Sequence, residues 1–357
     1  AALKKIGMIS DMPGMFIAAL QAGLICFFLL KIASKYDVSR TRQIVQTLSI
    51  LFGTFMWTNL SFGSAWQLAL GFAVVGEVGA IYFTVYDRRP LLAGFFFALG
   101  FGNRTEILLT APIFMYLLLR PSGPERAEKE SWLSVPSALV PLAKFCTVPA
   151  MLGIATLLYN YVRFHSFTDF GYSRIPGVLE EPWYNEGIFS WSYIPRQAWE
   201  MLFKSWEPWP AFPYLGPNGF SATILWSSPF LLFLFRTDAP RWLQQKYRAL
   251  RERMGERAYP SIYSLFSFRL LRRDHVLKYG AWTAIAILTV LLWTHGNSGG
   301  WQFGYRYAMV ILPWAFVIML EWAPRRFGIV EATAIGFSFA ANAYATWLYN
   351  WTTYMKP

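Results

Sequence analysis

The sequence is poor in charge, in cysteine and in histidine. Only 15% of its 357 residues are charged, whereas an average soluble domain has about a quarter. Its two cysteines, Cys26 and Cys146, both lie in apolar runs, so we expect neither a disulfide framework nor a cysteine metal site. A metal site needs several convergent ligands. With three histidines in the chain, of which His295 stands nearest the candidate residues below, we expect no metal site built on histidine.

Several nucleotide and cofactor motifs are also missing. The chain has no Walker loop, no dinucleotide-binding glycine motif, no HExxH and no haem or iron–sulfur ligand pattern. ATP-driven transport and redox chemistry with a soluble cofactor are therefore unsupported. The net charge of +12 could suggest nucleic acid, but the basic residues cluster between long apolar runs. This pattern is typical of membrane proteins with basic cytoplasmic loops, so we expect membrane lipids and no nucleic acid as partners.

Long apolar runs are what the sequence does contain, since 55% of its residues are hydrophobic and 19% are aromatic. Lipid forces backbone polar groups to pair within the chain, so each run predicts a helix. We expect an all-α polytopic membrane protein with about ten transmembrane helices, forming a single integral-membrane domain over residues 1–357. The predicted segments are residues 13–33, 46–62, 64–86, 90–103, 105–120, 137–162, 220–236, 278–295, 308–323 and 327–350.

Basic residues predict the orientation of these segments. Most of the 32 lysine and arginine residues fall in alternate loops, and residues 237–277 form the most basic one. The positive-inside rule places these loops in the cytoplasm. Residues 163–219 and 296–307 then lie on the extracytoplasmic side together with both visible chain ends, and we expect at least one further helix upstream.

Segments 90–103 and 105–120 are too short to cross a bilayer. At about 1.5 Å per residue they reach about 21–24 Å, whereas the hydrocarbon core is about 30 Å thick. Their shared turn contains Arg104 and Glu106 and should therefore lie below the outer surface. Polar groups at that depth need a wet cavity or protein partners. The pattern predicts a recessed chamber that is open to the outside.

Arg306 is the strongest candidate for a ligand-binding residue. It stands in GGWQFGYRYAMVILP, residues 299–313, at the mouth of an apolar helix. An arginine there is costly without an anionic partner, a path to water or a wet cavity, and its fork of donors matches phosphate oxygens. The alternative interpretation is an arginine that only anchors the helix among lipid headgroups.

Other candidates lie nearby in this topology. Arg104 could bind phosphate with Glu106 as its orienting partner, or the two could form a self-neutralising pair that supports the turn. Arg163 could line the chamber or anchor in headgroups. The intramembrane acid Glu77 could be functional or could satisfy a Trp or Tyr donor. The aromatic outer loop, residues 165–219, could be an anchoring belt or a lid over the chamber.

Four passages together resemble the GT-C superfamily of integral-membrane glycosyltransferases, near the bacterial and archaeal relatives of protein O-mannosyltransferases and the lipid A aminoarabinose transferase. The passages are FIAALQAGLICFFLLKIASK at 16–35, LLAGFFFALGFGNRTEILLTAP at 91–112, YNYVRFHSFTDFGY at 159–172 and GGWQFGYRYAMVILP at 299–313. The resemblance implies a GT-C-like fold with a large outer loop in a prokaryotic plasma (inner) membrane. It also implies transfer of a sugar from a polyprenyl-phosphate carrier to an acceptor on the extracytoplasmic side.

The resemblance implies roles for individual residues. Arg306 and Arg104, with Glu106 as the partner of Arg104, would hold the carrier phosphate, with Arg163 as further support. Tyr305 and Tyr307 would hydrogen-bond the phosphate or the sugar. Trp301 would stack on the donor. The family's acidic pair, which can hold a divalent metal, has no counterpart, because Asp11 is the only acid before Met12. The catalytic residue is therefore unassigned. Two alternatives stay open, a non-catalytic GT-C-like subunit of a larger membrane complex and a transporter of lipid-linked substrates.

Overall fold

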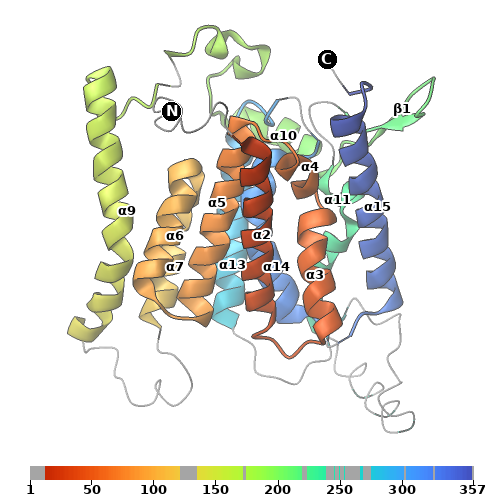
Figure 1. The fold of residues 1–357 in the computed structure, drawn as a ribbon, viewed down its shortest axis with the longest axis horizontal. Helices are drawn as coiled ribbons and strands as arrows, with labels where there is room; N and C mark the ends of the chain where they lie inside the picture. Colours follow the sequence, from red (N-terminus) through yellow and green to blue (C-terminus); the bar gives the residue numbers. More distant parts are fainter. Residues whose placement is uncertain are drawn as a thin grey trace.

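The structure is a computed structural model that describes residues 13–120, 135–171, 174–218, 223–238, 275–300, 303–324 and 326–355, with a few isolated positions between 239 and 274. The longer helices run side by side in one bundle (Figure 1). They are α2 (Gly14–Ala33), α3 (Arg40–Phe52), α5 (Ala65–Ile81), α6 (Pro90–Asn103), α9 (Val135–Phe164), α13 (His275–Thr294), α14 (Leu312–Trp322) and α15 (Ile329–Trp351).

Shorter elements complete the described part of the chain. The short α-helices are α4 (Met56–Leu60), α7 (Ala111–Leu119), α10 (Ile194–Leu202) and α11 (Ile224–Ser227). One π-helical turn, η1 (Tyr82–Tyr86), follows α5, and the 3-10 turns are η2 (Thr105–Thr110), η4 (Val178–Glu180), η5 (Pro182–Tyr184), η6 (Trp191–Tyr193), η7 (Pro229–Phe235) and η10 (Arg306–Ile311). Two-residue strands pair as β1 (Glu207–Pro208) with β2 (Leu215–Gly216) and as β3 (Thr237–Asp238) with β4 (Phe266–Ser267).

Each predicted apolar segment contains helical structure, which agrees with the predicted all-α polytopic class. Four helices in the described residues are long and apolar enough to cross a membrane, namely Gly14–Ala33, Ala65–Tyr86, Leu139–Phe164 and His275–Thr294. The count of about ten spans stays a prediction: Pro90–Asn103 and Thr105–Leu119 are apolar but shorter than a bilayer requires, and α15, with 23 residues, is not among the four. The predicted basic loop, residues 237–277, lies largely outside the described residues.

Two of the predicted segments, each expected to be one helix, are broken into two pieces in the structure. The segment predicted at 46–62 begins at Arg40, where the Ser39 hydroxyl accepts a hydrogen bond from the Arg42 amide, and it breaks at Gly53 between α3 and α4. The segment predicted at 220–236 is two short pieces, α11 and η7, separated at Ser228. Pro229 has no amide hydrogen with which to continue an α-helix.

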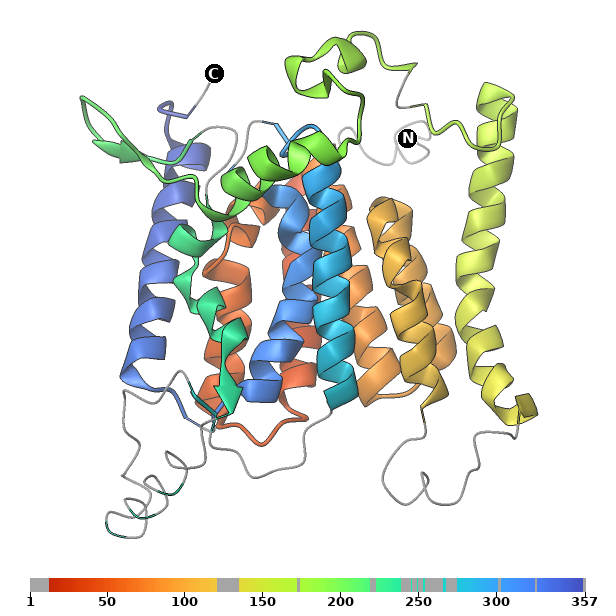
Figure 2. The ribbon, with the colours of Figure 1, turned by 180° about the vertical axis from the view of Figure 1, so that it is seen from behind.

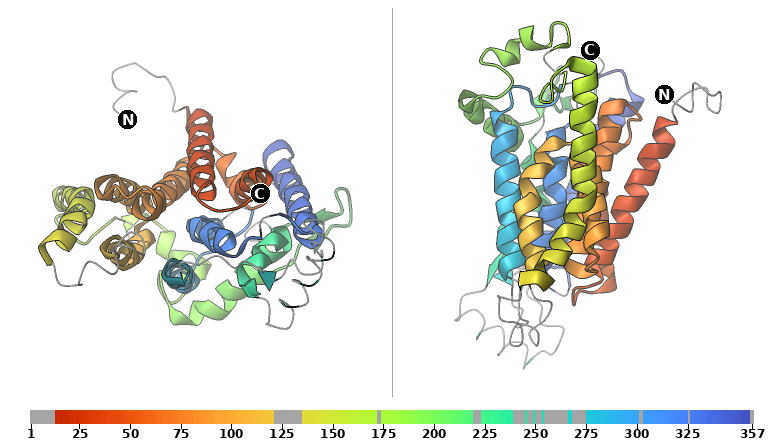
Figure 3. Two further views of the ribbon diagram at one scale, coloured as in Figure 1. Left: turned by 90° about the horizontal axis from the view of Figure 1, so that it is seen from below. Right: turned by 90° about the vertical axis from the view of Figure 1, so that its left-hand side faces the viewer.

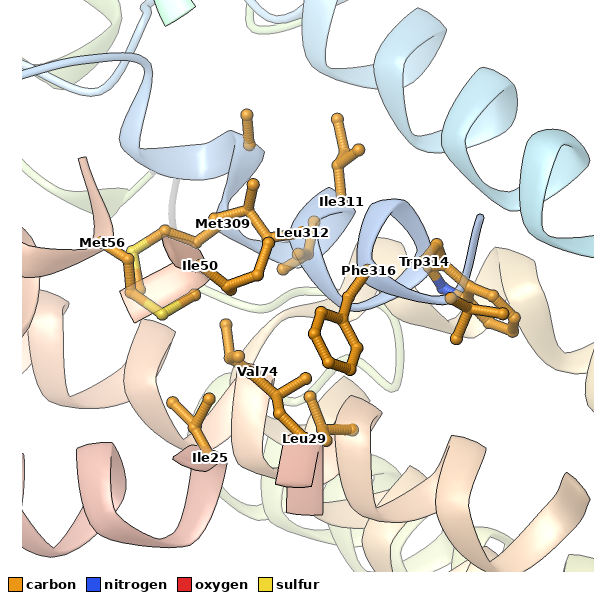
Figure 4. Packing of buried hydrophobic residues seen from close by; sticks show 14 of the residues in the cluster. Ile25, Leu29, Ile50, Met56, Val74, Met309, Ile311, Leu312, Trp314 and Phe316 are labelled. Carbon is orange, nitrogen blue, oxygen red and sulfur yellow. The ribbon is translucent and has the colours of Figure 1, made fainter. Parts of the chain in front are cut away.

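Helix α14 forms the centre of the bundle. All of its residues are buried, as expected for a helix that is apolar on every side. Figure 4 shows Phe316 of α14 packed close to Val74 of α5 and Leu29 of α2. The Trp314 indole donates a hydrogen bond of 2.7 Å to the buried carboxyl of Glu77. This contact agrees with the structural interpretation of Glu77, as the partner of an indole donor.

The connecting segments divide between two ends of the bundle. The start of α2, the end of α15, α10 and residues 296–300 and 303–305 lie at the end shown at the top of Figure 1, called the upper end here. The segments predicted to be extracytoplasmic thus share one end, although the side of the membrane stays a prediction. Helix α9 stands at the edge of the bundle (Figure 3), with only 6% of its apolar window buried.

A buried group of charges closes the opposite, lower end. This lower arginine cluster consists of Arg42, Arg236, Glu331 and Phe327. Arg42 donates from both terminal nitrogens to the two oxygens of Glu331, at 2.7 Å each. Arg236 approaches the same carboxylate at 3.1 Å, and the Phe327 ring centre lies 4.0 Å from the Arg42 guanidinium carbon. The cluster therefore joins α3, α15 and the end of η7.

Candidate functional site

Two arginines reach the upper end from similar local structures. Arg104 ends α6 and is followed by η2 and then by the proline-bearing helix α7. Arg306 opens η10, which leads into the proline-bearing helix α14. The chain enters η10 through Gly304, whose φ of 71° favours glycine and whose α-carbon packs against Phe55. Each arginine is therefore held at the entry to an apolar helix.

The two arginines meet at one aromatic ring. The guanidinium carbon of Arg104 lies 4.3 Å from the centre of the Tyr307 ring, and that of Arg306 lies 5.3 Å from it. Arg104 also donates from Nε to Glu106 at 2.6 Å. We call Arg104, Glu106, Arg306 and Tyr307 the upper arginine cluster. With two guanidinium groups and one carboxylate, it carries a formal net charge of one positive unit.

The side chains of the upper arginine cluster are partly buried, but solvent still reaches them. The side chains of Arg104 and Glu106 are 19% and 10% exposed, and Arg306 is half-buried. Within the described residues the buried Nε of Arg306 has no hydrogen-bond partner. In Figure 2 the turn that follows α6 ends below the upper ends of α9 and α13. This geometry agrees with the recessed turn that the short segments predict.

His295 joins this cluster, although the sequence analysis weighs it only as a metal ligand. Its ring meets the Tyr307 ring edge to face at 5.7 Å, and it also packs on Tyr184 and Phe189. Its Nδ1 lies 2.7 Å from the carbonyl oxygen of Asn297. The Asn297 amide nitrogen also lies 3.3 Å from Nδ1, but the shorter contact is to the carbonyl, which only accepts and therefore favours the tautomer with the proton on Nδ1 and an accepting Nε2. Burial lowers the pKa of His295, and the charge of Arg104 acts in the same direction.

Tyr305 lies behind the cluster rather than within it. Its side chain is fully buried, and its hydroxyl faces Gln197 Oε1 at 2.7 Å and the Leu292 carbonyl at 3.0 Å. Burial raises its pKa above the ordinary range. The structure therefore gives Tyr305 a supporting position, which differs from the expected contact with phosphate or sugar. Gln197, from the outer loop, is a connection that the sequence pattern does not reveal.

In the described part of the chain, the upper arginine cluster contains neither of the other two predicted site residues, Arg163 and Trp301. The described contacts of Arg163 are with Tyr159 and Phe164 of its own helix, α9, at 3.0 Å to the Tyr159 hydroxyl and 4.9 Å to the Phe164 ring centre. These contacts do not bring it to the upper arginine cluster. Trp301, predicted to stack on the donor, lies outside the described residues. The roles of both residues stay predictions.

A metal site is not apparent in the part of the chain that the structure describes, where no three His, Cys, Asp or Glu side chains come together. The chemistry of the upper arginine cluster is that of anion binding, because guanidinium groups donate in a fork that fits phosphate or carboxylate. The chain matches no protein-family model, no curated protein and no solved structure in the three comparisons made. The geometry of the site is therefore the basis for the functional argument.

Proposed function

We propose that the chain is a membrane glycosyltransferase that takes a sugar from a polyprenyl-phosphate carrier, with the upper arginine cluster binding the carrier phosphate. The observation that supports this best is the meeting of Arg104 and Arg306 at Tyr307. The two arginines come from helix entries about 200 positions apart in the sequence, and they carry one positive charge more than Glu106 neutralises. Unlike the arginines of the lower arginine cluster, Arg306 has no ion pair among the described residues and is only half-buried. An anionic ligand would neutralise the excess charge.

A phosphate suits this cluster better than a lone carboxylate does. Glu106 already engages Nε of Arg104, whereas Nε of Arg306 has no partner in the described residues. A phosphate monoester or diester can accept from both arginines at once through separate oxygens. The partly buried setting strengthens each of these contacts relative to bulk water.

The transfer step makes use of the same charges. The bond between the anomeric carbon and the phosphate oxygen breaks, a new bond to an acceptor hydroxyl oxygen forms, and the hydroxyl proton leaves to a base. Negative charge grows on the departing phosphate, where fixed guanidinium groups lower the barrier. We assign the proton to Nε2 of His295, because Nδ1 is engaged with Asn297 and the lowered pKa keeps the ring neutral and able to accept.

The test measures lipid binding and sugar release separately, with the full chain in lipid nanodiscs. A short polyprenyl phosphate is titrated against wild type, Arg306→Gln and Arg104→Gln, with the parent polyprenol as the uncharged probe. Each charge-assisted hydrogen bond contributes about 1.5–3 kcal/mol, so each variant should lose roughly tenfold to a hundredfold in affinity for the phosphate and nothing for the polyprenol. Arg89→Gln, at an exposed lower-end arginine, is the matched control and should bind as wild type does.

Turnover is then followed as release of polyprenyl phosphate from carriers charged with different sugars. Release that depends on Arg306 and falls in His295→Ala supports the transferase. Tight phosphate binding without release from any carrier would identify a non-catalytic lipid-binding subunit instead. If both arginine variants bind polyprenyl phosphate as wild type does, the phosphate site is wrong.

A further inference from the structure

A second concave site lies beside the upper arginine cluster. It is a cleft of about 290 Å³ between α10 and residues 296–298, and we call it the α10 cleft. Its volume is at the small end of the range for ligand pockets, about 300–1,000 Å³. Figure 2 shows α10 lying across the upper end of the bundle, where it forms one wall of this cleft. The cleft therefore suits a ligand of one or two sugar-sized rings.

The side chains that line the cleft are mostly polar, although about half of the exposed lining surface is apolar. Lys204, Glu200 and Arg196 contribute charges, and Asn218, Asn297 and Ser298 contribute amide and hydroxyl groups. Small-molecule pockets are usually lined mostly by apolar side chains, so this cleft does not suit an acyl or prenyl chain. Its donors and acceptors instead match a ligand with many hydroxyl groups. Two basic side chains against one acid favour a ligand that also carries a negative charge.

One aromatic side chain completes the lining. Trp183 is half-buried, and its indole nitrogen donates to Glu181 at 2.6 Å. This hydrogen bond fixes the plane of the ring. A fixed indole offers a flat apolar face to the carbon–hydrogen side of a sugar ring, with its polar edge already satisfied. The combination of one indole with surrounding amides and charges is that of a saccharide site.

The floor of the α10 cleft is rigid. The Gly296 carbonyl accepts from Gln197 at 2.9 Å and from the Arg196 guanidinium, and Gln197 is itself 1% exposed. A β-carbon at Gly296 would come within 2.5 Å of the Trp183 carbonyl oxygen. Asn297 accepts from the amides of Gly299 and Gly300 at 2.7 and 2.9 Å. A preformed floor reduces the entropy cost of binding.

The α10 cleft and the upper arginine cluster share a wall. His295 packs against Tyr307 of the cluster, and the next residue, Gly296, lines the cleft. Gln197 also connects the two sites, since it lines the cleft and holds the hydroxyl of Tyr305, the residue before Arg306. Residues that line the cleft and residues that contact the cluster are therefore neighbours in the chain at His295 and Gly296.

We propose that the α10 cleft binds a small saccharide that carries one anionic group, and that this saccharide is the acceptor of the transferred sugar. The binding claim stands on the cleft alone, whereas the acceptor role rests on the proposed glycosyltransferase function. Trp183 stacks on the sugar ring, Lys204 pairs with the anionic group, and Asn297 bonds to hydroxyl groups.

The experiment is saturation-transfer NMR on the full chain in nanodiscs, without any lipid donor. The probes are the methyl glycosides of glucose, galactose and mannose and their three uronic acid counterparts, which differ only by a carboxylate. At least one uronide should show saturation transfer, at least fivefold stronger than its neutral counterpart. Trp183→Leu should lower this signal at least fivefold, and Lys204→Met should abolish the preference for the uronide.

Matched controls separate these effects from general damage. Trp191→Leu removes a highly exposed indole from the same loop, Lys35→Met removes an exposed lysine from the lower end, and both should leave the signals unchanged. Absence of saturation transfer from all six probes would overturn the saccharide site, as would binding that survives both cleft variants. Arg306→Gln should keep uronide binding while losing polyprenyl phosphate. Failure of the cleft and failure of the phosphate site are therefore distinguishable.

Discussion

The two arginine clusters have almost the same composition and opposite settings. Each contains two arginines, one glutamate and one aromatic ring. In the lower cluster both oxygens of Glu331 accept from the fork of Arg42, and the arginines and the glutamate are buried. In the upper cluster Glu106 engages one nitrogen of Arg104, and Arg306 has no ion pair among the described residues.

The difference distinguishes an arginine that holds the fold together from one that is available to a ligand. Burying charges is repaid only when the geometry is excellent and most hydrogen bonds are made; in the lower arginine cluster Glu331 fills the fork of Arg42, although Nε of Arg42 has no hydrogen-bond partner in the described residues. The upper arginine cluster leaves donor capacity unused at a partly open site, which is the arrangement expected where an anion binds. Composition alone does not separate the two cases, whereas solvent access does, since Arg42 and Arg236 are buried and Arg306 is half-buried.

The largest effect on stability should come from breaking the lower arginine cluster. Arg42→Met leaves Glu331 with Arg236 as its remaining cation at 3.1 Å, so we expect a loss of about 3 kcal/mol, the low end for a broken buried pair. Denaturant unfolding in bicelles measures it. Arg40→Met, at an exposed position two residues earlier, should cost almost nothing. Equal stability of the two variants would show that the buried pair does not hold α3 to α15.

A backbone change should disturb the upper arginine cluster next most strongly. In Gly304→Ala the new methyl group meets Phe55 at 2.5 Å in a backbone conformation that disfavours alanine, so we expect a loss of about 1–3 kcal/mol in stability. Gly336→Ala, in α15 where an added β-carbon meets nothing within 4 Å, should be neutral or slightly stabilising. Thermal unfolding of the two variants compares them, and a neutral Gly304→Ala would contradict the close approach to Phe55.

Removing the aromatic ring of each cluster should have different effects: loss of Phe327 should lower stability, and loss of Tyr307 should weaken phosphate binding. Phe327→Leu removes a ring 4.0 Å from a fully buried arginine, so stability should fall by about 2 kcal/mol, the range for desolvated cation–π contacts. Tyr307→Leu should change stability little and weaken polyprenyl phosphate binding about fivefold, because both arginines lose the ring that orients them. Tyr307→Phe keeps the ring and should bind as wild type does. An effect of Phe327→Leu on lipid binding would argue that the two clusters are coupled.

The smallest effect should be a dependence of stability on pH through His295. Its pKa is lowered in the folded state, so the unfolded chain binds more protons than the native protein once the pH falls below about 6.5. This contribution to stability is complete above that pH and is lost progressively as the pH decreases, until the folded pKa is reached. Melting curves between pH 7.5 and 5.5 should therefore converge for wild type and His295→Gln. Parallel curves would contradict a neutral, buried imidazole.

Much of the fold follows from patterns that act within a few residues of each other. Pro90 and the polar turn at Asn103 bound an uninterrupted apolar run, and the helix predicted there has the same ends as α6. The break at Gly53 is harder to foresee from hydropathy, because the run stays apolar through Phe55 and Met56; the glycine at the C-cap of α3 is its only local signal. The discontinuity at Ser228 is readable from Pro229, but hydropathy alone hides it.

The candidate site is predictable only in part for the same reason. Arg104 and Arg306 are visible in the sequence because a charge at a helix mouth is unusual. Their meeting at Tyr307 depends on the packing of η2 and η10 against the same helix, α13, which no local pattern encodes. Gln197 stands in an amphipathic loop helix without any local signal, and its bond to Tyr305 emerges only when that helix lies across the upper end.

The separation of Arg42 from Glu331 along the chain has a consequence for biogenesis. The two residues are 289 positions apart, so a ribosome completes α3 long before it synthesises the carboxylate that neutralises it. Until α15 enters the bilayer, the guanidinium of Arg42 must stay hydrated or near headgroups, because an unpaired charge in lipid is costly. Arrival of α15 permits its burial. A chain that terminates early would retain this cation in the open, where membrane quality-control proteases can distinguish it from the finished protein.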